Sequence, residues 1–573
     1  MKKNQDPIMF TFSGGINNRN TPIELFYRKQ GECVNVVNAD TDLLGRLKLL
    51  RPSSALNQIS VDSIHSIFRA NDVTFVGAGT TLYYLDEDDE LASLITELSG
   101  DEISFAQVGY WIFLTDGTYK KSIYIGGDTP TACEWGKSVP DTAPTVAIGA
   151  AGNPTGTYSC YYRYKITLPD GTIIRTDLSP VASIAVVDQK IQWTDLNHAN
   201  YTGATTNQIE LFRFKTGWSA TYLIATIDEG TDSYLDNITD AVAIVSTAYG
   251  EDGYYPPPDN INLIYYNPNC DRLFMAVDNN IYWTEAAKYN IVFYDTTNSI
   301  YTNTNGVYGD GEDITALEIM DEQLYIGSKK TWTRLRGTNP TYWIWESIKG
   351  ASRGPLTSRA FILTSFGIVQ LGVDGRFIIF NGFETSPFLD NFVFSTKPDT
   401  TTHMVFDGRF LRMFYNDATY PSIIIDFLGF PNISPKVIKS THNATASYYD
   451  YKTDNLYLGD SSGYIRNGDD ENTSVTMSIT TPDIPIGNLI DLDNIPTLLI
   501  YADTKGEDLT ITPYYDGVEQ DDLQAVNTDS LEWVAMPLPH NDYRMISFVA
   551  TISTYKDIEI REPWIIKKED DAT

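Results

Sequence analysis

Two short stretches of the sequence decide its fold: LYIGSKKTWTRL at residues 324–335 and LYLGDSSGYIR at residues 456–466. In each stretch an alternating apolar run is followed by a short polar segment and then by a second apolar run. Successive side chains of a strand point to opposite faces, so each run can bury one face, and the polar segment supplies the chain reversal. Each stretch therefore predicts a β-hairpin.

Five further stretches repeat the pattern, at residues 73–85, 111–125, 273–283, 368–380 and 410–420. Five of the six intervals between the starts of successive hairpins are 38 to 51 residues long. One four-stranded propeller blade takes roughly 40–50 residues. The spacing therefore predicts an all-β protein built on a β-propeller of six or seven blades. The alternative is a set of unrelated hairpins in β-sandwiches.

The remaining interval, between residues 111 and 273, is 162 residues long. It is too long for one blade and leaves room for an inserted domain at residues 138–255. This region holds several short alternating runs, including a tyrosine-rich one at residues 157–167 and a late Tyr-Leu-Asp at residues 234–236. The order resembles a fibronectin type III domain, which is a small β-sandwich. Such domains are usually binding or spacing modules, so the fold does not name the ligand.

These patterns divide the chain into five parts. We expect an N-terminal docking or closure segment at residues 1–60, two propeller blades at 61–137 and the inserted domain at 138–255. The remaining blades follow at 256–475, and a small C-terminal β-sandwich with a charged tail occupies 476–573. The simplest interpretation of the first part is a lead-in strand that closes the propeller ring.

The formal net charge of −34 is the main compositional signal. Such a charge repels nucleic-acid phosphates and anionic membranes and favours solubility. It fits either plain solvation of a large surface or a channel wall that must not hold DNA. The sequence has no apolar run of 18 residues, so we expect no membrane-spanning segment, and its start lacks the apolar core of a signal peptide. The four scattered cysteines predict buried free thiols.

No stretch carries a recognisable catalytic or metal-binding motif. Zinc-ligand spacing, a nucleophile elbow and a phosphate-binding loop are all missing from the sequence. The acidic run at residues 86–90 is interpreted as a solvated turn, and the one at 310–313 as a fragment that lacks the order of a calcium loop. Trp332, Trp343 and Trp345 fit core packing better than a sugar-stacking platform. We therefore expect no catalytic residue, no metal ligand and no cofactor.

The first 60 residues contain an ordered set of glycines, asparagines and prolines. It reads Gly-Gly-Ile-Asn, Pro, Gly-Glu-x-x-Asn-x-x-Asn, Gly-x-Leu and Arg-Pro, carried by Gly14, Gly15, Asn17, Pro22, Gly31, Glu32, Asn35, Asn38, Gly45, Leu47, Arg51 and Pro52. This order, followed at once by the hairpins, resembles the opening of the nozzle, hub or tail tubular protein B-like proteins of tailed, short-tailed bacteriophages. The motif covers about 40 residues, and the propeller extends the likeness over about 300.

The resemblance implies a structural virion protein of the phage tail and not an enzyme. It would form part of the tail tube, through which DNA passes without specific binding, as a homo-oligomeric ring around the tail axis in which the resemblance favours six copies. Its partners would be a portal-proximal adaptor and tail fibres. The residues expected at the assembly interface are Gly14, Gly15, Asn17, Arg19, Pro22, Gly45, Arg46, Arg51 and Pro52.

A second hypothesis comes from another class of protein. It is a carbohydrate-binding or glycoside-hydrolysing propeller with a fibronectin-like accessory domain, which would need inward carboxylates or an aromatic cleft at one mouth of the propeller. Receptor recognition through the inserted domain is compatible with the tail hypothesis.

Overall fold

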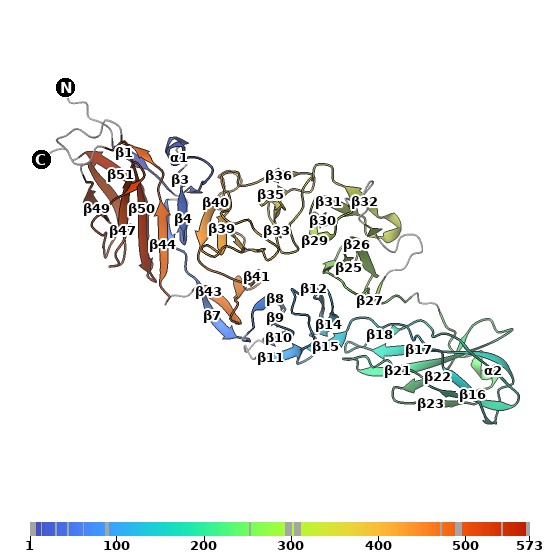
Figure 1. Cartoon of the computed structure of the whole chain (residues 1–573). Coiled ribbons are helices and arrows are strands. Elements are labelled where there is room, and N and C mark those ends of the chain that lie inside the picture. Colours follow the sequence, from blue (N-terminus) through green and yellow to red (C-terminus); the bar gives the residue numbers. More distant parts are fainter. Residues whose placement is uncertain are drawn as a thin grey trace. The chain divides into compact units, whose positions relative to one another are not determined.

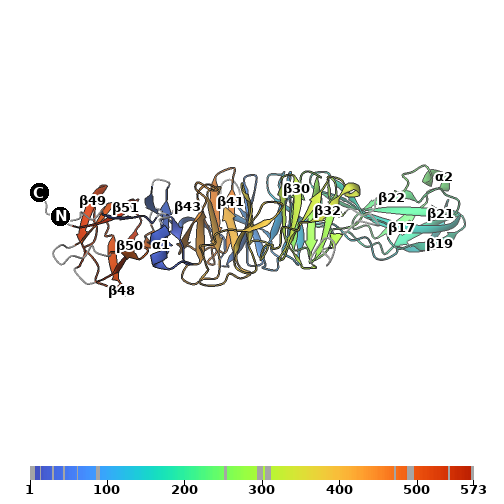
Figure 2. The same cartoon turned by 90° about the horizontal axis from the view of Figure 1, so that it is seen from above.

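The computed structural model describes residues 7–12, 14–28, 31–42, 45–60, 62–85, 91–250, 254–292, 301–302, 311–469, 473–486, 496–539 and 543–568. The protein is all-β, built from many small antiparallel sheets (Figures 1 and 2). It divides into two compact units, one of Met1–Arg69 with Ile348–Thr573 and the other of Ala70–Ser347. No helix within the described ranges is long and apolar enough to cross a membrane.

The second unit contains a series of sheets whose strands are neighbours in chain order. One sheet holds β9 (Val73–Ala78), β10 (Thr81–Leu85) and β11 (Leu91–Ile95), and the next holds β12 (Ser104–Val108), β13 (Trp111–Thr115), β14 (Lys120–Tyr124) and β15 (Thr131–Glu134). Another contains β24 (Leu263–Asn267), β25 (Arg272–Val277), β26 (Asn280–Glu285) and β27 (Lys288–Val292), with β28 (Tyr301–Thr302) on β26. The last contains β29 (Ile314–Met320), β30 (Gln323–Ser328), β31 (Trp332–Arg336) and β32 (Ile344–Ser347), with the 3₁₀ helix η1 (Pro340–Tyr342) before β32.

Between β15 and β24 the same unit holds two further sheets. One has the order β16 (Thr145–Ala151), β20 (Gln189–Thr194), β23 (Ser233–Asp236). The other has the order β18 (Ile173–Arg175), β17 (Gly156–Thr167), β21 (Thr206–Lys215), β22 (Tyr222–Asp228), with β19 (Ala182–Val186) also on β17. The short helix α2 (Asp240–Ala243) follows β23. Buried Tyr162 and Trp193 come from different sheets and share one core, so the two sheets are packed together.

The first unit contains three groups of strands that are neighbours in chain order. The first is a sheet of β33 (Phe361–Thr364), β34 (Gly367–Leu371), β35 (Phe377–Phe380) and β36 (Thr385–Pro387). The second, which is one end of a larger sheet, is β37 (His403–Phe406), β38 (Phe410–Phe414), β39 (Ser422–Asp426) and β40 (Lys436–Ser440), and the third is β41 (Ala446–Asp450), β42 (Asn455–Gly459) and β43 (Tyr464–Asp469). The strand β7 (Ser53–Gln58) pairs antiparallel with β43 and completes that sheet. The division of the sequence into the two units falls within the strand β8 (Ile64–Ala70), after Arg69.

Other N-terminal strands join the C-terminal strands of the first unit. The strand β4 (Asn35–Val37) lies between β40 and β44 (Val475–Thr480), and the sheet continues through β50 (Met545–Thr554), β47 (Thr510–Tyr515) and β48 (Val518–Glu519), with β45 (Ile484–Pro485) on β50. A second sheet runs β49 (Glu532–Pro537), β46 (Pro496–Asp503), β51 (Glu559–Lys568), β6 (Arg46–Leu49) and β5 (Ala39–Thr41), with β1 (Ile8–Phe10) on β51. Fully buried Phe548 of the first sheet and Trp564 of the second belong to one hydrophobic core.

All seven hairpins predicted from the sequence are confirmed by the strand pairing. The hairpin of β34 and β35 shows the local cause. Its turn contains Gly375 at φ +72°, a conformation that glycine adopts without steric cost, and the Asp374 carboxylate accepts the Arg376 N–H at 3.3 Å. The turn residues and the alternation of apolar side chains in the two strands therefore both favour this hairpin.

A buried ion pair connects the two sheets of the 138–255 region. Arg213 of β21 and Asp236 of β23 are both fully buried, and Nη1 of Arg213 lies 2.6 Å from Oδ2 of Asp236. Arg213 also donates to the carbonyl of Ile238 at 3.0 Å, and its guanidinium lies 4.5 Å from the ring centroid of Tyr158. The two charges therefore neutralise each other, and removal of either partner would weaken the compensation of a buried charge.

We expect Asp236→Ala to lower the stability of this region by up to about 3–5 kcal/mol, because buried Arg213 would lose its 2.6 Å partner and keep only the longer contact with Asp240 at 3.5 Å. Cys160, fully buried on β17 opposite Arg213, reports local opening, so the measurement is urea-dependent thiol labelling of Cys160 resolved by peptide mass. The matched control is Glu285→Ala, which breaks the exposed pair with Lys288 (3.0 Å) and should cost less than about 1 kcal/mol. Equal effects of the two variants would contradict the argument.

Candidate functional site

Three of the expected assembly residues, Gly14, Gly15 and Asn17, lie in one N-terminal turn. The N–H of Gly14 donates to the carbonyl of Gly31 at 2.7 Å. Asn17 is 1% exposed, and its side-chain oxygen accepts the N–H groups of Arg19 and Asn20, each at 3.2 Å. The turn is therefore held by its own polar groups against β3 (Glu32–Cys33).

Gly15, in β2 (Gly15–Ile16), touches the backbone of β40. Its φ is +80°, and a Cβ atom placed there would lie 2.8 Å from the backbone nitrogen of Val437 and 3.0 Å from Cβ of Lys436. Carbon atoms that close overlap, and the left-handed conformation adds strain for any other residue. Only glycine fits this position.

Pro22 and Arg19 flank the start of the helix α1 (Pro22–Arg28). Pro22 takes the first helical position, where its missing N–H costs nothing, and the Glu24 carboxylate accepts the N–H of Thr21 at 2.9 Å. The side chain of Arg19 is 41% exposed and lies 3.8 Å from Asp390. Among these residues, Arg19 has the side chain most open to a partner.

Gly45 and Arg46 lie beside β51. Gly45 has φ +72°, its carbonyl accepts the N–H of Glu562 at 3.1 Å, and a Cβ atom there would lie 2.9 Å from Oε2 of Glu562. Arg46 forms an ion pair with Asp42, whose Oδ1 also accepts the Arg46 N–H at 3.0 Å. Both residues therefore hold β6 in place next to the C-terminal strand.

Arg51 and Pro52 lead into β7. Nη2 of Arg51 donates to the carbonyl of Tyr555 at 3.0 Å and to Asp557 at 2.9 Å, and the Arg51 side chain is 12% exposed. The nine expected residues are thus not brought into one surface: one group surrounds β2 and α1, and the other follows β6. Their role in assembly stays a prediction.

Asn38 belongs to the motif, but its structural role could not be read from the sequence. It has φ 51°, in the left-handed region that asparagine tolerates better than most residues. Its side chain donates to Oγ1 of Thr441 at 2.9 Å and to the carbonyl of Thr476 at 3.0 Å, and accepts the N–H of Thr441 at 3.1 Å. One buried amide therefore ties β4 to both of its neighbours. The only sign in the sequence that this position matters is the repeated asparagine of the motif, Asn35 and Asn38.

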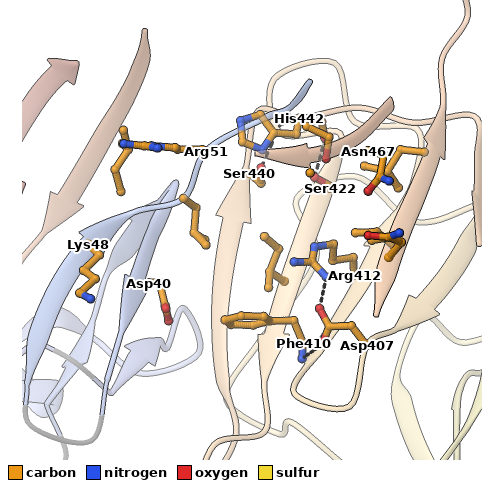
Figure 3. A pocket seen from close by; sticks show the side chains of 18 of the residues that line it. Asp40, Lys48, Arg51, Asp407, Phe410, Arg412, Ser422, Ser440, His442 and Asn467 are labelled. Carbon is orange, nitrogen blue, oxygen red and sulfur yellow. Dashed lines mark hydrogen bonds and ion pairs between the residues drawn. The ribbon is translucent and has the colours of Figure 1, made fainter. Parts of the chain in front are cut away.

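The first unit also contains a cavity of about 490 Å³ (Figure 3). The N-terminal segment lines one side with residues that include Asp40, Lys48 and Arg51, and β38, β39, β40, β42 and β43 supply the other side. The lining is mixed, with carboxylates, cations and hydroxyls beside apolar side chains such as Phe410. Such a lining suits a polar ligand or a polar segment of a partner protein better than an apolar molecule.

Ion pairs neutralise most charges around this cavity. Arg409 bridges Asp40 at 2.7 Å and Asp426 at 2.9 Å, and Arg412 pairs with Asp407. Burial raises the pKa of Asp40, and the guanidinium of Arg409 opposes that shift. The cavity therefore has no strong positive or negative electrostatic potential.

His442 supplies a neutral imidazole to the cavity. Burial, helped by the charge of Arg412, lowers the pKa of His442 to about 4. Its backbone is fixed by two serines, since its N–H donates to Ser440 Oγ at 3.1 Å and its carbonyl accepts the hydroxyl of Ser422 at 2.6 Å. Its buried Nε2 has no hydrogen-bond partner within the part of the chain that the structure describes.

The other chemistry considered from the sequence is structural or lies outside the described residues. All four cysteines are free and buried, as predicted, and burial raises the pKa of Cys133 and Cys160 to about 12. Trp332 is fully buried, and Trp343 and Trp345 pack on Trp283 with centroid distances of 4.9 and 6.0 Å, which confirms the core-packing interpretation. The acidic run at 86–90 and residue 310 of the second run lie outside the described residues. Within the described part of the chain, no group of three or more His, Cys, Asp and Glu side chains could hold a metal ion.

Neither a protein-family model nor a curated protein sequence matches the chain. Among solved structures, it is similar to the computationally designed Ika8 protein at 10% identity, with a TM-score of 0.33 over 73% of this chain and 100% of the designed one. It is also similar to the extracellular domain of a B. thetaiotaomicron protein assigned as a one component system, at 10% identity and a TM-score of 0.23 over 99% of each chain. These sequence identities and TM-scores are too low to indicate a shared fold or function.

Gly15→Ala should destabilise the first unit, because the new methyl group meets the backbone of Val437. The matched control is Gly517→Ala, which has the same kind of positive φ (82°) but nothing within 4 Å of the new Cβ. We expect a cost of about 1–2 kcal/mol for the control from conformation alone, and a larger cost for Gly15→Ala from added overlap. Thermal unfolding of the two variants measures the difference, and equal melting temperatures would show that β2 does not press on β40.

His442 should make stability depend on pH. Its folded pKa of about 4 is below its ordinary value of 6.5, so between these pH values the unfolded chain binds a proton that the folded chain does not. The stabilisation is complete above pH about 6.5 and decreases by up to about 3 kcal/mol as the pH falls through about 4. Urea unfolding of wild type and His442→Asn at several pH values in this range measures the dependence of the unfolding free energy on pH. The variant should show a weaker dependence than wild type, and an equal dependence would refute the role of His442.

Proposed function

We propose that this protein is a structural component of a tailed-phage virion, part of the nozzle or hub of the tail tube, with several copies around the tail axis. In this proposal it has no catalytic residue and no cofactor. DNA passes along it without being specifically bound, and a portal-proximal adaptor and tail fibres are its neighbours.

The observation that carries the proposal is the way the motif-bearing N-terminal segment is built into the first unit. β4 lies inside a sheet, β7 completes another, and Gly15 and Asn38 fix the segment to β40 and to the turn after it. The residues that resemble the opening of phage tail proteins thus contact several strands of this unit. An N-terminal segment built into the fold in this way supports a structural function.

We further propose that the chain-order sheets are the blades of a β-propeller and that the 138–255 region is a fibronectin III-like insertion. Support for the first point comes from the sheet β41–β42–β43–β7, in which a strand from the N-terminal part completes a sheet from the C-terminal part. A circular fold needs such a closure, because its first and last strands must meet. Support for the second comes from the two packed sheets that share one core in that region.

The charge of the chain agrees with a tube wall. With 75 acidic and 41 basic residues, the protein repels the DNA backbone instead of releasing counterions from it. A wall that bound DNA through many phosphate contacts would slow its passage, and a net negative wall avoids this. The same charge lowers the expected affinity for nucleic acid at any salt concentration.

The proposal predicts that the protein is present in purified virions and located at the tail. The measurement is immunogold electron microscopy of intact and DNA-ejected particles, with antibodies against residues 138–255, combined with virion mass spectrometry. Gold clustered at the tail supports the proposal. Absence from both assays, together with binding on a glycan array or release of sugars from polysaccharides, would replace it with the carbohydrate hypothesis.

A further inference from the structure

The cavity of the first unit is lined by polar side chains that the fold itself leaves unpaired. The side chains of Lys48, Ser53, Asn455 and Asn467 have no hydrogen-bond or ion-pair partner within the described part of the chain. The buried Nε2 of His442 is also unpartnered there. Figure 3 shows Lys48 on the wall formed by the N-terminal segment, and His442 and Asn467 on the facing wall. Unpaired hydrogen-bonding groups therefore line the cavity on both sides.

The charged side chains of the lining leave no net charge for a ligand to meet. Asp40 and Asp407 are paired with arginines, and Arg51 is paired with a carboxylate at 2.9 Å. The two remaining charges are opposite in sign, Lys48 and Asp454, and the Asp454 carboxylate accepts a tyrosine hydroxyl at 2.6 Å. A ligand ion of either sign would meet a like charge as well as an opposite one, whereas a neutral ligand loses no ionic hydration on entry. The lining therefore favours a neutral ligand.

The unpaired groups are of the kind that bind hydroxyls. The side-chain amides of Asn455 and Asn467 each offer two N–H donors and an oxygen acceptor, and a hydroxyl can both donate and accept. Nε2 of His442 donates or accepts according to its tautomer, and a ligand hydroxyl serves either case. Because a buried polar atom without a partner is costly, a hydroxyl bound at Nε2 would stabilise the site.

The same lining contains half-buried apolar side chains, Leu49, Phe410 and Leu456. Water can satisfy the polar groups but gains nothing beside these apolar ones. A sugar ring has hydroxyls at its edge and C–H groups on its faces, so it can contact both. The cavity volume of about 490 Å³ is that of a small-molecule site, for which roughly 300–1,000 Å³ is typical. The cavity therefore suits a small ligand that combines hydroxyls with C–H surface.

From these observations we infer that the cavity is a binding site for a neutral carbohydrate, either a mono- or disaccharide or the end of a longer glycan. Asn455, Asn467 and His442 bind its hydroxyls, and the leucines of the lining contact its C–H groups. This site adds a ligand-binding function to the proposed structural one and does not rest on it.

The test is binding of the full chain to an array of neutral and anionic glycans, followed by titration of the best neutral glycan by saturation-transfer NMR. Asn455→Ala and Asn467→Ala should each weaken binding by about fivefold, the effect expected when a hydrogen bond or two are lost. Neither side chain has a partner within the described chain, so these changes leave the hydrogen bonds of the fold intact. The matched control is Asn432→Ala, which removes an exposed amide outside the cavity and should bind as wild type does.

A chain that binds no neutral glycan, or that binds only anionic ones, would overturn the inference. So would a neutral glycan that binds wild type, Asn455→Ala and Asn467→Ala equally well, because it would occupy another site. The two proposals fail separately. A chain that binds a glycan through Asn467 but is absent from virions would remove the tail function and keep the cavity site, and a virion protein that binds no glycan would do the reverse.

Discussion

The side-chain amide of Asn38 is the interaction on which the first unit depends. It bonds to Thr441, just after β40, and to Thr476 of β44, so that β4 is held between two strands far along the chain. A single residue thereby joins the start of the protein to both neighbours of β4 in one sheet. Without β4, the edges of β40 and β44 would be left with unpaired backbone groups, which are costly when buried.

The same arrangement explains why the N-terminal residues form several separate contacts instead of one patch. Gly15 must approach β40, Gly45 must approach β51, and Arg51 must reach the turn at Asp557 before β7 begins. Each of these positions is set by a different neighbour. Other residues of the same segment, with Arg51, line one side of the cavity that contains His442, so the position of the N-terminal segment also shapes that cavity.

The local part of this structure could be predicted from the sequence, and the long-range part could not. The hairpins follow from alternation and from turn residues such as Asp374 and Gly375, which act within a few positions of each other. The pairing of β4 with β44 joins Val36 to Ile479, and no local pattern specifies a partner so distant. The row of Trp533, Tyr501 and Arg561 on the C-terminal sheet likewise depends on register, because these residues become neighbours only when three strands are aligned. Among the expected assembly residues, the motif identified glycines whose backbone conformation and close contacts restrict the residue type. The residues they contact are distant in sequence and could not be predicted from it.

If the N-terminal segment is a permanent part of the first unit, its strands must open together with the strands they pair with, and hydrogen exchange of the full chain measures this opening. We expect the hydrogen-bonded amides of β4 and β7 to exchange as slowly as those of their partners β44 and β43, since each pair opens together. Fast exchange of β4 and β7 beside slow exchange of β43 and β44 would contradict it, because the segment would then be an attached arm and not a structural element.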